Sequence, residues 1–209
     1  GNGIRCVGKF LYDQGMINVN EKSDIKIETL SGIKDLKVYT RGGEVKGLRV
    51  DMGKAILDPK EIPVKSDKET IINEPVTIEG NDYNITCVSI GNPHCVVFCD
   101  NVDSLDLENL GPAFENNELF PERVNTEFAK VLNENTIKMR VWERGSGETW
   151  SCGTGACAVA VAACENGLCK KGADITVKLK GGELVINYTD DTVYLTGNAE
   201  KIYEGEVEI

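Results

Sequence analysis

The chain has 209 residues, of which 34 are Asp or Glu and 23 are Lys or Arg, so its formal net charge at pH 7 is −11. This acidic balance argues against nucleic acid and anionic membrane surfaces as partners, because both attract proteins through positive charge. The longest uncharged apolar stretch, 155–164, is far shorter than the roughly 18 residues that a membrane-spanning helix needs. We therefore expect a cytoplasmic protein whose partner is a small substrate or another protein.

The cysteines indicate a reducing compartment rather than a disulfide framework. The chain holds eight cysteines and one histidine, His94. A domain of this size does not need disulfide staples, so we interpret the cysteines as reduced thiols. With no CxxC pair, the sequence predicts no structural metal site, and it contains neither a P-loop nor a complete dinucleotide fingerprint. We expect no metal and no cofactor.

Most of the chain is predicted to form short strands, because apolar residues alternate with polar ones and turn residues separate the runs. The segment 56–69 contains two prolines and mixed charge, which is typical of a connection between lobes and places a boundary near Gly53. The final strand is expected to return to the first lobe. The predicted strands are 25–27, 36–40, 48–52, 76–78, 83–90, 95–98, 126–132, 136–142, 174–179, 183–188, 192–196 and 201–209.

Helices are predicted at 4–12, 105–116 and 154–166. The second is interrupted by Gly111-Pro112, a pair that disfavours helix. The third contains "ACAVAVAAC", which has no polar face. A helix that is apolar all round is buried on all sides, and its Ala and Cys side chains let strands approach closely. We expect this segment to be a core helix wrapped by sheet.

Two stretches of the chain align without a gap. "GNGIRCVGKFLYDQG" at 1–15 and "GTGACAVAVAACENG" at 153–167 share glycine at their first, third and last positions. The last glycine lies where a helix C-cap glycine belongs, so each stretch is predicted to form a Gly-rich turn, a helix and a C-cap that ends the helix. The repeat indicates two related lobes. Because Cys152 directly precedes the second stretch, we expect a functional cysteine directly before Gly1 and a chain that begins just after it.

A cysteine at a helix start is suited to acid–base chemistry. The first N–H groups of a helix are unpaired and carry partial positive charge, which lowers a thiol pKa to roughly 3.5–7.5 in favourable cases. The same N–H groups can bind a carboxylate. Two facing helix starts would place one thiol on each face of an amino acid's α-carbon, so one removes a proton and the other returns one. This predicts racemisation without a cofactor, against the alternative that Cys152 is a small buried apolar residue.

Six blocks of the sequence together resemble the diaminopimelate epimerase family. The blocks are "GNGIRC" at 1–6, "GNPHCV" at 91–96, "RVNTEF" at 123–128, "ERGSGET" at 143–149, "SCGTGA" at 151–156 and "YEGEV" at 203–207. The resemblance implies an α/β (α+β) fold of two pseudo-symmetric lobes, each a mixed, mostly antiparallel sheet wrapped around a central helix. It implies that 1–52 with 198–209 form the remainder of the first lobe, without its N-terminal section, and that 53–197 form the second.

The resemblance also implies a function. The family converts LL-diaminopimelate to meso-diaminopimelate with two cysteines and no cofactor, in lysine and peptidoglycan precursor biosynthesis. By this resemblance Cys152 is one catalytic acid/base, and its partner cysteine directly precedes Gly1. The enzyme is expected to be a homodimer with a contact at Tyr203. The residues implied to bind the carboxylate of the reacting centre are Gly1, Asn2, Gly153 and Thr154.

Four further residues are implied to bind the distal end of the substrate: Asn92, Asn125, Glu143 and Arg144. An Arg can hold a carboxylate bidentately, and Glu can accept from an ammonium group. His94 with Glu143 is implied to tune the thiols. Simpler readings stay open: Glu143 and Arg144 as a solvated strand-end pair, Asn92 as the turn residue before Pro93, and His94 as a structural donor.

The remaining cysteines are expected to have structural roles, and three alternative functions stay open. Cys6 aligns with Ala158 inside the helix, so it is not expected to be catalytic. The alternative functions are another cofactor-independent racemase or isomerase of the same fold, a cysteine hydrolase that uses Cys152 and His94, and an inactive fragment or binding remnant. The cysteines assigned to packing are Cys95, Cys99, Cys157, Cys164 and Cys169.

Overall fold

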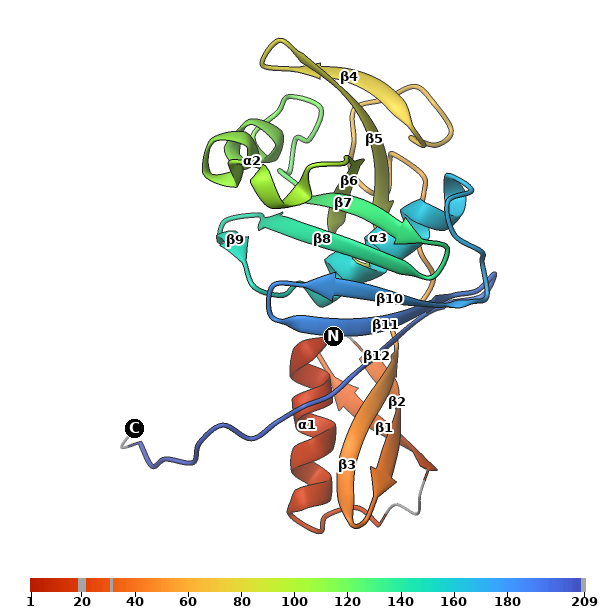
Figure 1. Cartoon of the computed structure of the whole chain (residues 1–209). Helices are drawn as coiled ribbons and strands as arrows, with labels where there is room; N and C mark the ends of the chain where they lie inside the picture. The colour runs from red at the N-terminus through yellow and green to blue at the C-terminus, as the bar shows by residue number, and fades with distance from the viewer. Residues whose placement is uncertain (19–21, 31, 208–209) are drawn as a thin grey trace. The chain divides into compact units, whose positions relative to one another are not determined.

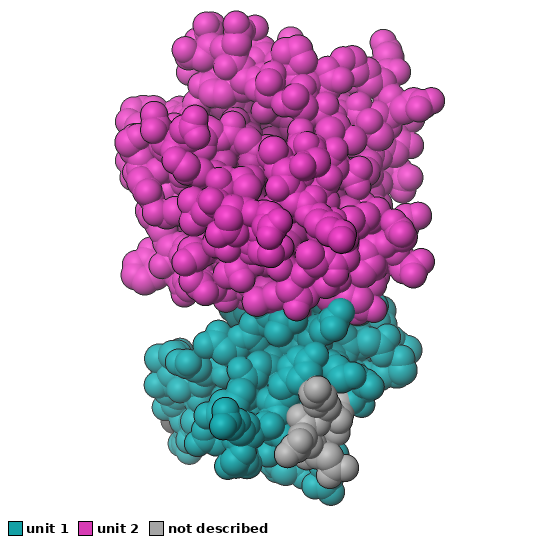
Figure 2. All heavy atoms as spheres, turned by 45° about the vertical axis from the view of Figure 1, so that its right-hand side comes forward, with its two compact units in different colours: residues 1–51, 196–209 teal, residues 52–195 magenta. Residues whose placement is uncertain are grey.

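The computed structural model describes residues 1–18, 22–30 and 32–207. It is a mixed α+β structure with few helices, which confirms the predicted fold class. The chain divides into two compact units, coloured separately in Figure 2: unit 1 comprises Gly1–Asp51 and Thr196–Ile209, and unit 2 comprises Met52–Leu195. The lobe limits implied by the resemblance, 1–52 with 198–209 and 53–197, stay a prediction.

In its described residues, unit 1 contains one helix, three antiparallel strands and the end of β12 (Val193–Gly197). Helix α1 (Asn2–Asp13) is followed by β1 (Lys22–Thr29), β2 (Gly32–Arg41) and β3 (Glu44–Asp51), and β2 pairs with both of the other strands. The helix packs on β2 and β3 through Gly8. A Cβ atom at Gly8 would lie 2.7 Å from Leu48 Cδ2 and 3.0 Å from Leu36 Cδ2, so the absence of a side chain permits this close approach.

Unit 2 is built on a mixed sheet (Figure 1). Its strand order is β12-β11-β10-β8-β7-β6-β5-β4, with β9 paired to β8; β12 crosses the limit between the units. The pairs β6–β7 and β8–β10 are parallel, and the other pairs whose register is known are antiparallel. The strands are β4 (Glu74–Ile78), β5 (Asn81–Ser89), β6 (Pro93–Phe98), β7 (Asn125–Asn133), β8 (Thr136–Glu143), β9 (Gly147–Thr149), β10 (Asp174–Leu179), β11 (Gly182–Tyr188) and β12 (Val193–Gly197).

Helix α3 (Gly153–Glu165) forms the centre of unit 2 (Figure 1). It contacts β5, β6, β7, β8, β10 and β11, and every residue from Gly155 to Ala163 is buried. The small Ala and Cys side chains allow strands to pack around the helix. The expectation of a core helix wrapped by sheet is therefore confirmed.

A second core in unit 2 includes α2 (Leu107–Glu115), which follows the short helix η1 (Val102–Ser104). Phe114 makes edge-to-face contacts with Tyr83 and Phe128, at centroid distances of 5.0 and 5.3 Å. Helix α2 continues through Pro112 instead of breaking there. Its Asp106 cap accepts a hydrogen bond from the Asn109 N–H, and its burial against this core stabilises it.

Two sequence predictions about the chain's course are wrong. The segment 56–69 is part of unit 2 rather than a connection, because Ile62 and Val64 are buried in the second core. The predicted strand 201–209 is not formed over 201–207, and residues 208–209 lie outside the described part of the chain. Ile202 and Tyr203 are 83% and 84% exposed. An alternating pattern supplies one apolar face, but a strand also needs a neighbour to pair with its backbone.

None of the helices in the described ranges combines the length and the apolar character that crossing a membrane requires.

Candidate functional site

The thiol of Cys152 lies at the start of the central helix of unit 2. Cys152 is the N-cap residue of α3, with extended backbone angles (φ −126°, ψ 110°). Its Sγ accepts a hydrogen bond from the Gly155 N–H at 3.3 Å and lies 3.6 Å from Thr154 Oγ1. The residue is only 6% exposed. The thiol therefore replaces the oxygen that usually caps a helix.

The protonation of Cys152 differs from the sequence expectation. Burial raises the pKa of the Cys152 thiol to about 12, and the charges of Glu127 and Glu143 also raise it. Hydrogen bonds from the Thr154 hydroxyl and the Gly155 N–H lower it, but by less. The expected lowering of the thiol pKa by the helix start is thus wrong for this structure, because desolvation outweighs the helix terminus. At neutral pH Cys152 is a thiol that can donate a proton.

A polar chain connects the helix start to β6. The Asn92 side chain donates from Nδ2 to Thr154 Oγ1 at 3.3 Å, and its Oδ1 lies 3.0 Å from His94 Nε2. The turn before β6 requires Gly91, whose φ of 89° lies in the left-handed region. Asn92 is therefore held between the first turn of α3 and the only histidine of the chain.

The other nitrogen of His94 contacts a residue that the sequence analysis missed. His94 Nδ1 lies 2.7 Å from Glu127 Oε1, and both side chains are fully buried. The resemblance implied that His94 and Glu143 tune the thiols, and it did not include Glu127. The sequence "NTEF" contained a signal for Glu127. Residues two apart on a strand share a face, so Glu127 lies on the same face of β7 as Asn125. Asn125 in turn lies beside His94 in the parallel register of β6 and β7.

Because both nitrogens of His94 face Asn92 and Glu127, this imidazole is not a base for the Cys152 thiol. A cysteine hydrolase needs such a contact. The geometry therefore does not favour the hydrolase alternative.

The Asn125 side chain, at the start of β7, forms hydrogen bonds to the start of β6 and to the turn after β8. Its Nδ2 donates to the Pro93 carbonyl at 2.9 Å, and its Oδ1 accepts from the Arg144 N–H at 3.0 Å. Asn125 is 5% exposed. It fixes the beginning of β6 to the turn between β8 and β9, so its first role in this structure is to hold the site together.

Glu143 and Arg144 lie at the turn of the β8–β9 hairpin. Glu143 Oε1 accepts a hydrogen bond from the Thr149 hydroxyl, and Arg144 Nη1 donates to the Glu122 carbonyl at 2.9 Å. Glu143 also acts electrostatically on Cys152. The structure thus places Glu143 within electrostatic reach of the helix start, and Arg144 follows it in the same turn.

Helix α2 supports this hairpin from one side through Glu115. The buried Glu115 carboxylate accepts hydrogen bonds from Trp142 Nε1 at 2.7 Å, the Gly145 N–H at 2.9 Å and Arg123 Nη1 at 3.0 Å. The Trp142 ring fills the space beside Gly111, where a Cβ atom would lie 2.1 Å from the ring. The Gly111 that weakened the helix prediction is required by this packing.

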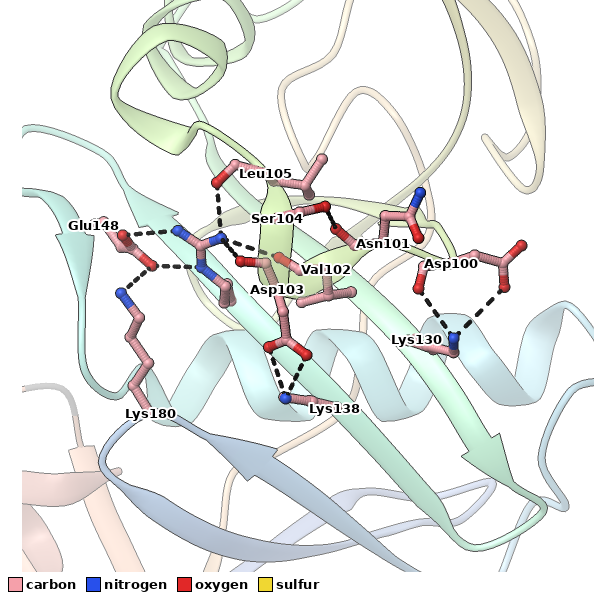
Figure 3. A network of polar contacts seen from close by, with 11 residues as sticks. Asp100, Asn101, Val102, Asp103, Ser104, Leu105, Lys130, Lys138, Glu148 and Lys180 are labelled. Carbon is pink, nitrogen blue, oxygen red and sulfur yellow. Dashed lines mark hydrogen bonds and ion pairs between the residues drawn. The ribbon is translucent and has the colours of Figure 1, made fainter.

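The base of the hairpin is held by an ion-pair network (Figure 3). The Arg140 guanidinium binds both oxygens of Glu148, at 2.7 and 3.1 Å, and the carbonyl groups of residues 102, 103 and 105. Lys180 Nζ also lies 2.8 Å from Glu148, and these cations lower the pKa of the Glu148 carboxyl. Bidentate pairs of this kind fix geometry. The turn that carries Glu143 and Arg144 is therefore supported at both ends.

The predicted site residues of unit 1 lie at the start of α1 and in the C-terminal segment. Gly1 is the N-cap of α1, and Asn2 Oδ1 accepts from Arg5 Nη2 at 3.3 Å and from Cys6 Sγ at 3.9 Å. Gly1, Asn2 and Tyr203 are exposed. Cys6 lies within the helix, as its alignment with Ala158 predicted.

The site of unit 2 thus combines a protonated thiol, a helix start and fixed polar groups. In the ranges that the structure describes, no three His, Cys, Asp or Glu side chains are arranged to hold a metal ion. The first N–H groups of α3 form the kind of site that binds a carboxylate. A proton donor beside a bound carboxylate can act on the adjacent α-carbon.

Known proteins resemble this chain over its whole length. A family model described as diaminopimelate epimerase matches residues 86–202. Proteins named diaminopimelate epimerase from Acetivibrio thermocellus and Methanococcus maripaludis are 52% and 50% identical to the chain over 211 aligned residues. In both cases the match includes 100% of this chain and 74% of the relative. Another from Agathobacter rectalis is 46% identical, over 100% of this chain and 75% of its own length.

Solved structures resemble the fold at low sequence identity. A probable proline racemase from Agrobacterium radiobacter has a TM-score of 0.72 at 15% identity, over 94% of this chain and 64% of its own. A hydroxyproline epimerase from Agrobacterium vitis has a TM-score of 0.70 at 14% identity, over 94% of this chain and 62% of its own. These likenesses concern the fold. The identity to the curated relatives, over the whole chain, carries the assignment, and the chain belongs to the diaminopimelate epimerase family of isomerases.

Proposed function

We propose that this chain supplies Cys152 as one of two acid–base thiols in the cofactor-independent epimerisation of LL-diaminopimelate to meso-diaminopimelate. The observation that carries the proposal is the buried, protonated thiol at the N-cap of α3, hydrogen-bonded to the Gly155 N–H. The second thiol, by the register of the repeat, would occupy the position directly before Gly1. Family membership supports the substrate, and the repeat supports the pairing of two helix starts.

The proton movements follow from this arrangement. A thiolate on one face takes the α-hydrogen as a proton, and the electron pair of the broken C–H bond is delocalised into the carboxylate. The Cys152 thiol donates its proton to the opposite face, which forms a new C–H bond and inverts the centre. The first turns of α3 and α1, at Gly153 and Thr154 and at Gly1 and Asn2, would stabilise the carboxylate as negative charge develops on it.

The distal amino acid end of the substrate would bind at the β8–β9 turn. The Arg144 guanidinium would hold the distal carboxylate bidentately, and the Glu143 carboxylate would accept from the ammonium group. Asn92 and Asn125 would contribute amide groups, in addition to the bonds that they make in this structure. His94 would tune the thiol through Asn92 and Thr154. The rigid support of this turn by Glu115 and Glu148 favours recognition of a substrate of fixed length.

The cellular setting is inferred from the family. We propose a cytoplasmic enzyme of lysine and peptidoglycan precursor biosynthesis that acts as a homodimer, with Tyr203 at the dimer contact. The 84% exposure of Tyr203 is compatible with a role in association. Sedimentation at micromolar concentration tests this part, since a strictly monomeric epimerase would contradict it.

The catalytic proposal is tested by following both stereoisomers of diaminopimelate in deuterated water. The test protein is this chain extended N-terminally by a segment from a diaminopimelate epimerase that ends in cysteine, so that a cysteine directly precedes Gly1. We expect deuterium incorporation with inversion, no dependence on pyridoxal phosphate and no effect of a chelator. Cys152→Ala is expected to abolish inversion. Cys164→Ala, at the other end of the same helix, is the matched control and should leave it unchanged.

The unextended chain is expected not to invert the substrate, because inversion needs a proton donor and an acceptor on opposite faces. Comparable inversion by the extended and unextended proteins would show that the catalytic pair is misplaced, and a pyridoxal-dependent activity would refute the mechanism.

A further inference from the structure

Glu127 is a buried carboxylate that the mechanism above does not use. It lies on β7 with its side chain fully buried, among strands whose neighbouring residues are largely apolar. One oxygen, Oε1, contacts His94, whereas Oε2 has no hydrogen-bond partner among the described residues. An isolated buried charge is costly to a fold. The position of Glu127 therefore calls for an explanation beyond packing.

The carboxylate lies directly against the helix start that carries the thiol. A Cβ atom at Gly155 would lie 2.6 Å from Glu127 Oε1 and 3.2 Å from Cys152 Sγ. Any larger residue at this position would displace one of the two groups. Because Gly155 also donates its N–H to the thiol, Glu127 and Cys152 are neighbours across a single glycine.

The hydrogen-bond pattern assigns the protons of the His94–Glu127 pair. Asn92 directs its amide nitrogen to Thr154, so its carbonyl oxygen faces His94 Nε2, which must then carry a hydrogen. A second hydrogen lies between Nδ1 and Glu127 Oε1, at a separation of 2.7 Å. The pair thus holds two protons and has no net charge. Removal of the carboxyl group would change this proton count.

We propose that Glu127 is a positioning residue of the epimerase site: it keeps both nitrogens of His94 protonated, so that His94, Asn92 and Thr154 stay aligned on the helix start, and it holds Cys152 in the thiol form. This inference rests on the proposed function of Cys152.

The groups around the thiol determine how Glu127 acts on it. Charged or titratable groups face Cys152 from β7 (Glu127), from β8 (Glu143) and, through Asn92 and Thr154, from β6 (His94). Helix α3 contributes the Thr154 hydroxyl and the Gly155 N–H, which favour the thiolate. Although the His94–Glu127 pair has no net charge, its negative group lies against the thiol across Gly155. Glu127 is also the carboxylate with the larger effect on the Cys152 pKa, so replacing it by a neutral amide should favour the thiolate.

The decisive variant is Glu127→Gln, which keeps the shape of the side chain but cannot carry the negative charge or accept the hydrogen shared with His94 Nδ1. Because His94 is the only histidine, ¹⁵N-histidine labelling of this chain reports on one imidazole without assignment. We expect the wild-type signals to show one hydrogen on Nε2 and a second one shared between Nδ1 and Glu127, as the hydrogen-bond pattern assigns them. In the variant the glutamine amide donates to Nδ1, and the ring should carry hydrogen on Nε2 alone. Identical spectra for the two proteins would overturn the proposal.

A second readout measures the thiol directly. Alkylation by iodoacetamide at pH 8, resolved by peptide mass spectrometry, gives the rate at Cys152. Glu127→Gln should raise this rate about tenfold, which corresponds to a pKa decrease of about one unit. Glu165→Gln, at the far end of α3, is the matched control and should leave the rate unchanged. A rate at Cys152 that rises equally in both variants, or in neither, would contradict a specific role for Glu127.

Glu127→Asp provides an independent check if the glutamine variant does not fold. It keeps the charge but withdraws the carboxylate from His94 by one methylene group. We expect the alkylation rate to stay within about threefold of wild type, while Nδ1 of His94 loses its bonded proton. A change of about tenfold or more in the Cys152 alkylation rate, with unchanged His94 signals, would contradict the proposal that the Glu127 charge acts on the thiol and its contact acts on His94.

Measurements of epimerase activity distinguish this proposal from the proposed function. In the N-terminally extended protein, Glu127→Gln should lower kcat at least about tenfold, leave KM within about threefold and displace the pH profile. If the extended wild type does not exchange the α-hydrogen, the proposed function fails, whereas the His94 and alkylation measurements still decide the role of Glu127. If it does exchange and the variant shows the wild-type pH profile, the inference about Glu127 fails alone.

Discussion

The helices α1 and α3 have aligned sequences but different surroundings. In α3 every residue from Gly155 to Ala163 is buried, whereas in α1 only Arg5 and Gly8 are buried. Val7 and Phe10 of α1 are 42% and 57% exposed. Helix α3 contacts six strands of unit 2, and α1 contacts β2 and β3 of unit 1. A shared pattern of turns and caps therefore fixes where a helix starts and stops but not how much of it is covered.

The two helices do end alike. In α1 the N–H groups of Gln14, Gly15 and Met16 bond to carbonyls of the last turn, and in α3 those of Asn166, Gly167 and Leu168 do the same. Gly15 and Gly167 have φ values of 66° and 69°. The predicted C-cap glycines are thus confirmed, because both adopt the left-handed conformation that favours glycine.

The largest expected contrast is in thiol reactivity at the two helices. Cys6 in α1 is exposed, whereas Cys152 is buried and its pKa is raised to about 12. The ordinary pKa of a cysteine thiol is 9.0. Raising it to about 12 lowers the thiolate fraction of Cys152 at pH 8 about a thousandfold. We expect iodoacetamide to modify the exposed Cys6 first and to modify Cys152 about a thousandfold more slowly than an ordinary thiol. Peptide mass spectrometry measures both rates.

The sign of the pH effect provides a control for this prediction. A raised pKa means that the folded protein favours the thiol, so Cys152 should gain reactivity as the pH rises from 9 toward 12. Rapid modification of Cys152 at pH 7 would show that the helix start, and not burial, governs its protonation.

The next contrast exchanges side chains between aligned positions of the helices. Phe10 of α1 aligns with Ala162 of α3. Ala162→Phe should destabilise unit 2 by about 3 kcal/mol, because a fully enclosed site cannot accept a ring. Phe10→Ala should cost less than about 1 kcal/mol, since the side chain is more than half exposed.

Urea denaturation measures these changes. Both tryptophans, Trp142 and Trp150, belong to unit 2, so their fluorescence reports on that unit, and far-UV circular dichroism includes unit 1. Equal decreases in the free energy of unfolding for Ala162→Phe and Phe10→Ala would mean that the two helices are buried to the same extent in solution.

A smaller contrast concerns the third glycine of the repeat. Gly155→Ala should destabilise unit 2 by about 2 kcal/mol, because the new methyl group would meet Glu127 Oε1 at 2.6 Å. The aligned Gly3 has nothing within 4 Å of its Cβ position. Gly3→Ala should therefore stabilise α1 by up to about 1 kcal/mol. The same denaturation measurement checks both variants, and a stabilising effect of Gly155→Ala would refute the packing described at the helix start.

The smallest effect is one that the two helices should share. Gly15→Ala and Gly167→Ala should each cost about 1 kcal/mol, because both positions need a positive φ and neither Cβ atom would meet a neighbour. Circular dichroism follows the first variant and tryptophan fluorescence the second. Costs that differ by more than about 1 kcal/mol would show that the two C-caps are not equivalent.

Much of the fold could be read from local patterns. Alternation located the strands from β1 to β12 apart from the short β9, and the missing polar face of "ACAVAVAAC" predicted the enclosed helix. These features depend on neighbours within a few residues. The C-terminal segment was mispredicted because its pattern resembled a strand, whereas strand formation depends on a partner that the local sequence does not supply.

For the site, sequence patterns were sufficient to identify the family and to place Cys152 at the start of a helix. The protonation of that thiol and the partner of His94 depend on tertiary packing. Burial and the Glu127 charge raise the Cys152 pKa, although the helix terminus alone predicted the opposite. The contact of His94 with Glu127 arises from the parallel pairing of β6 with β7. Desolvation and charge depend on groups brought together from distant parts of the chain, so they follow from the packed structure and not from the spacing of residues along it.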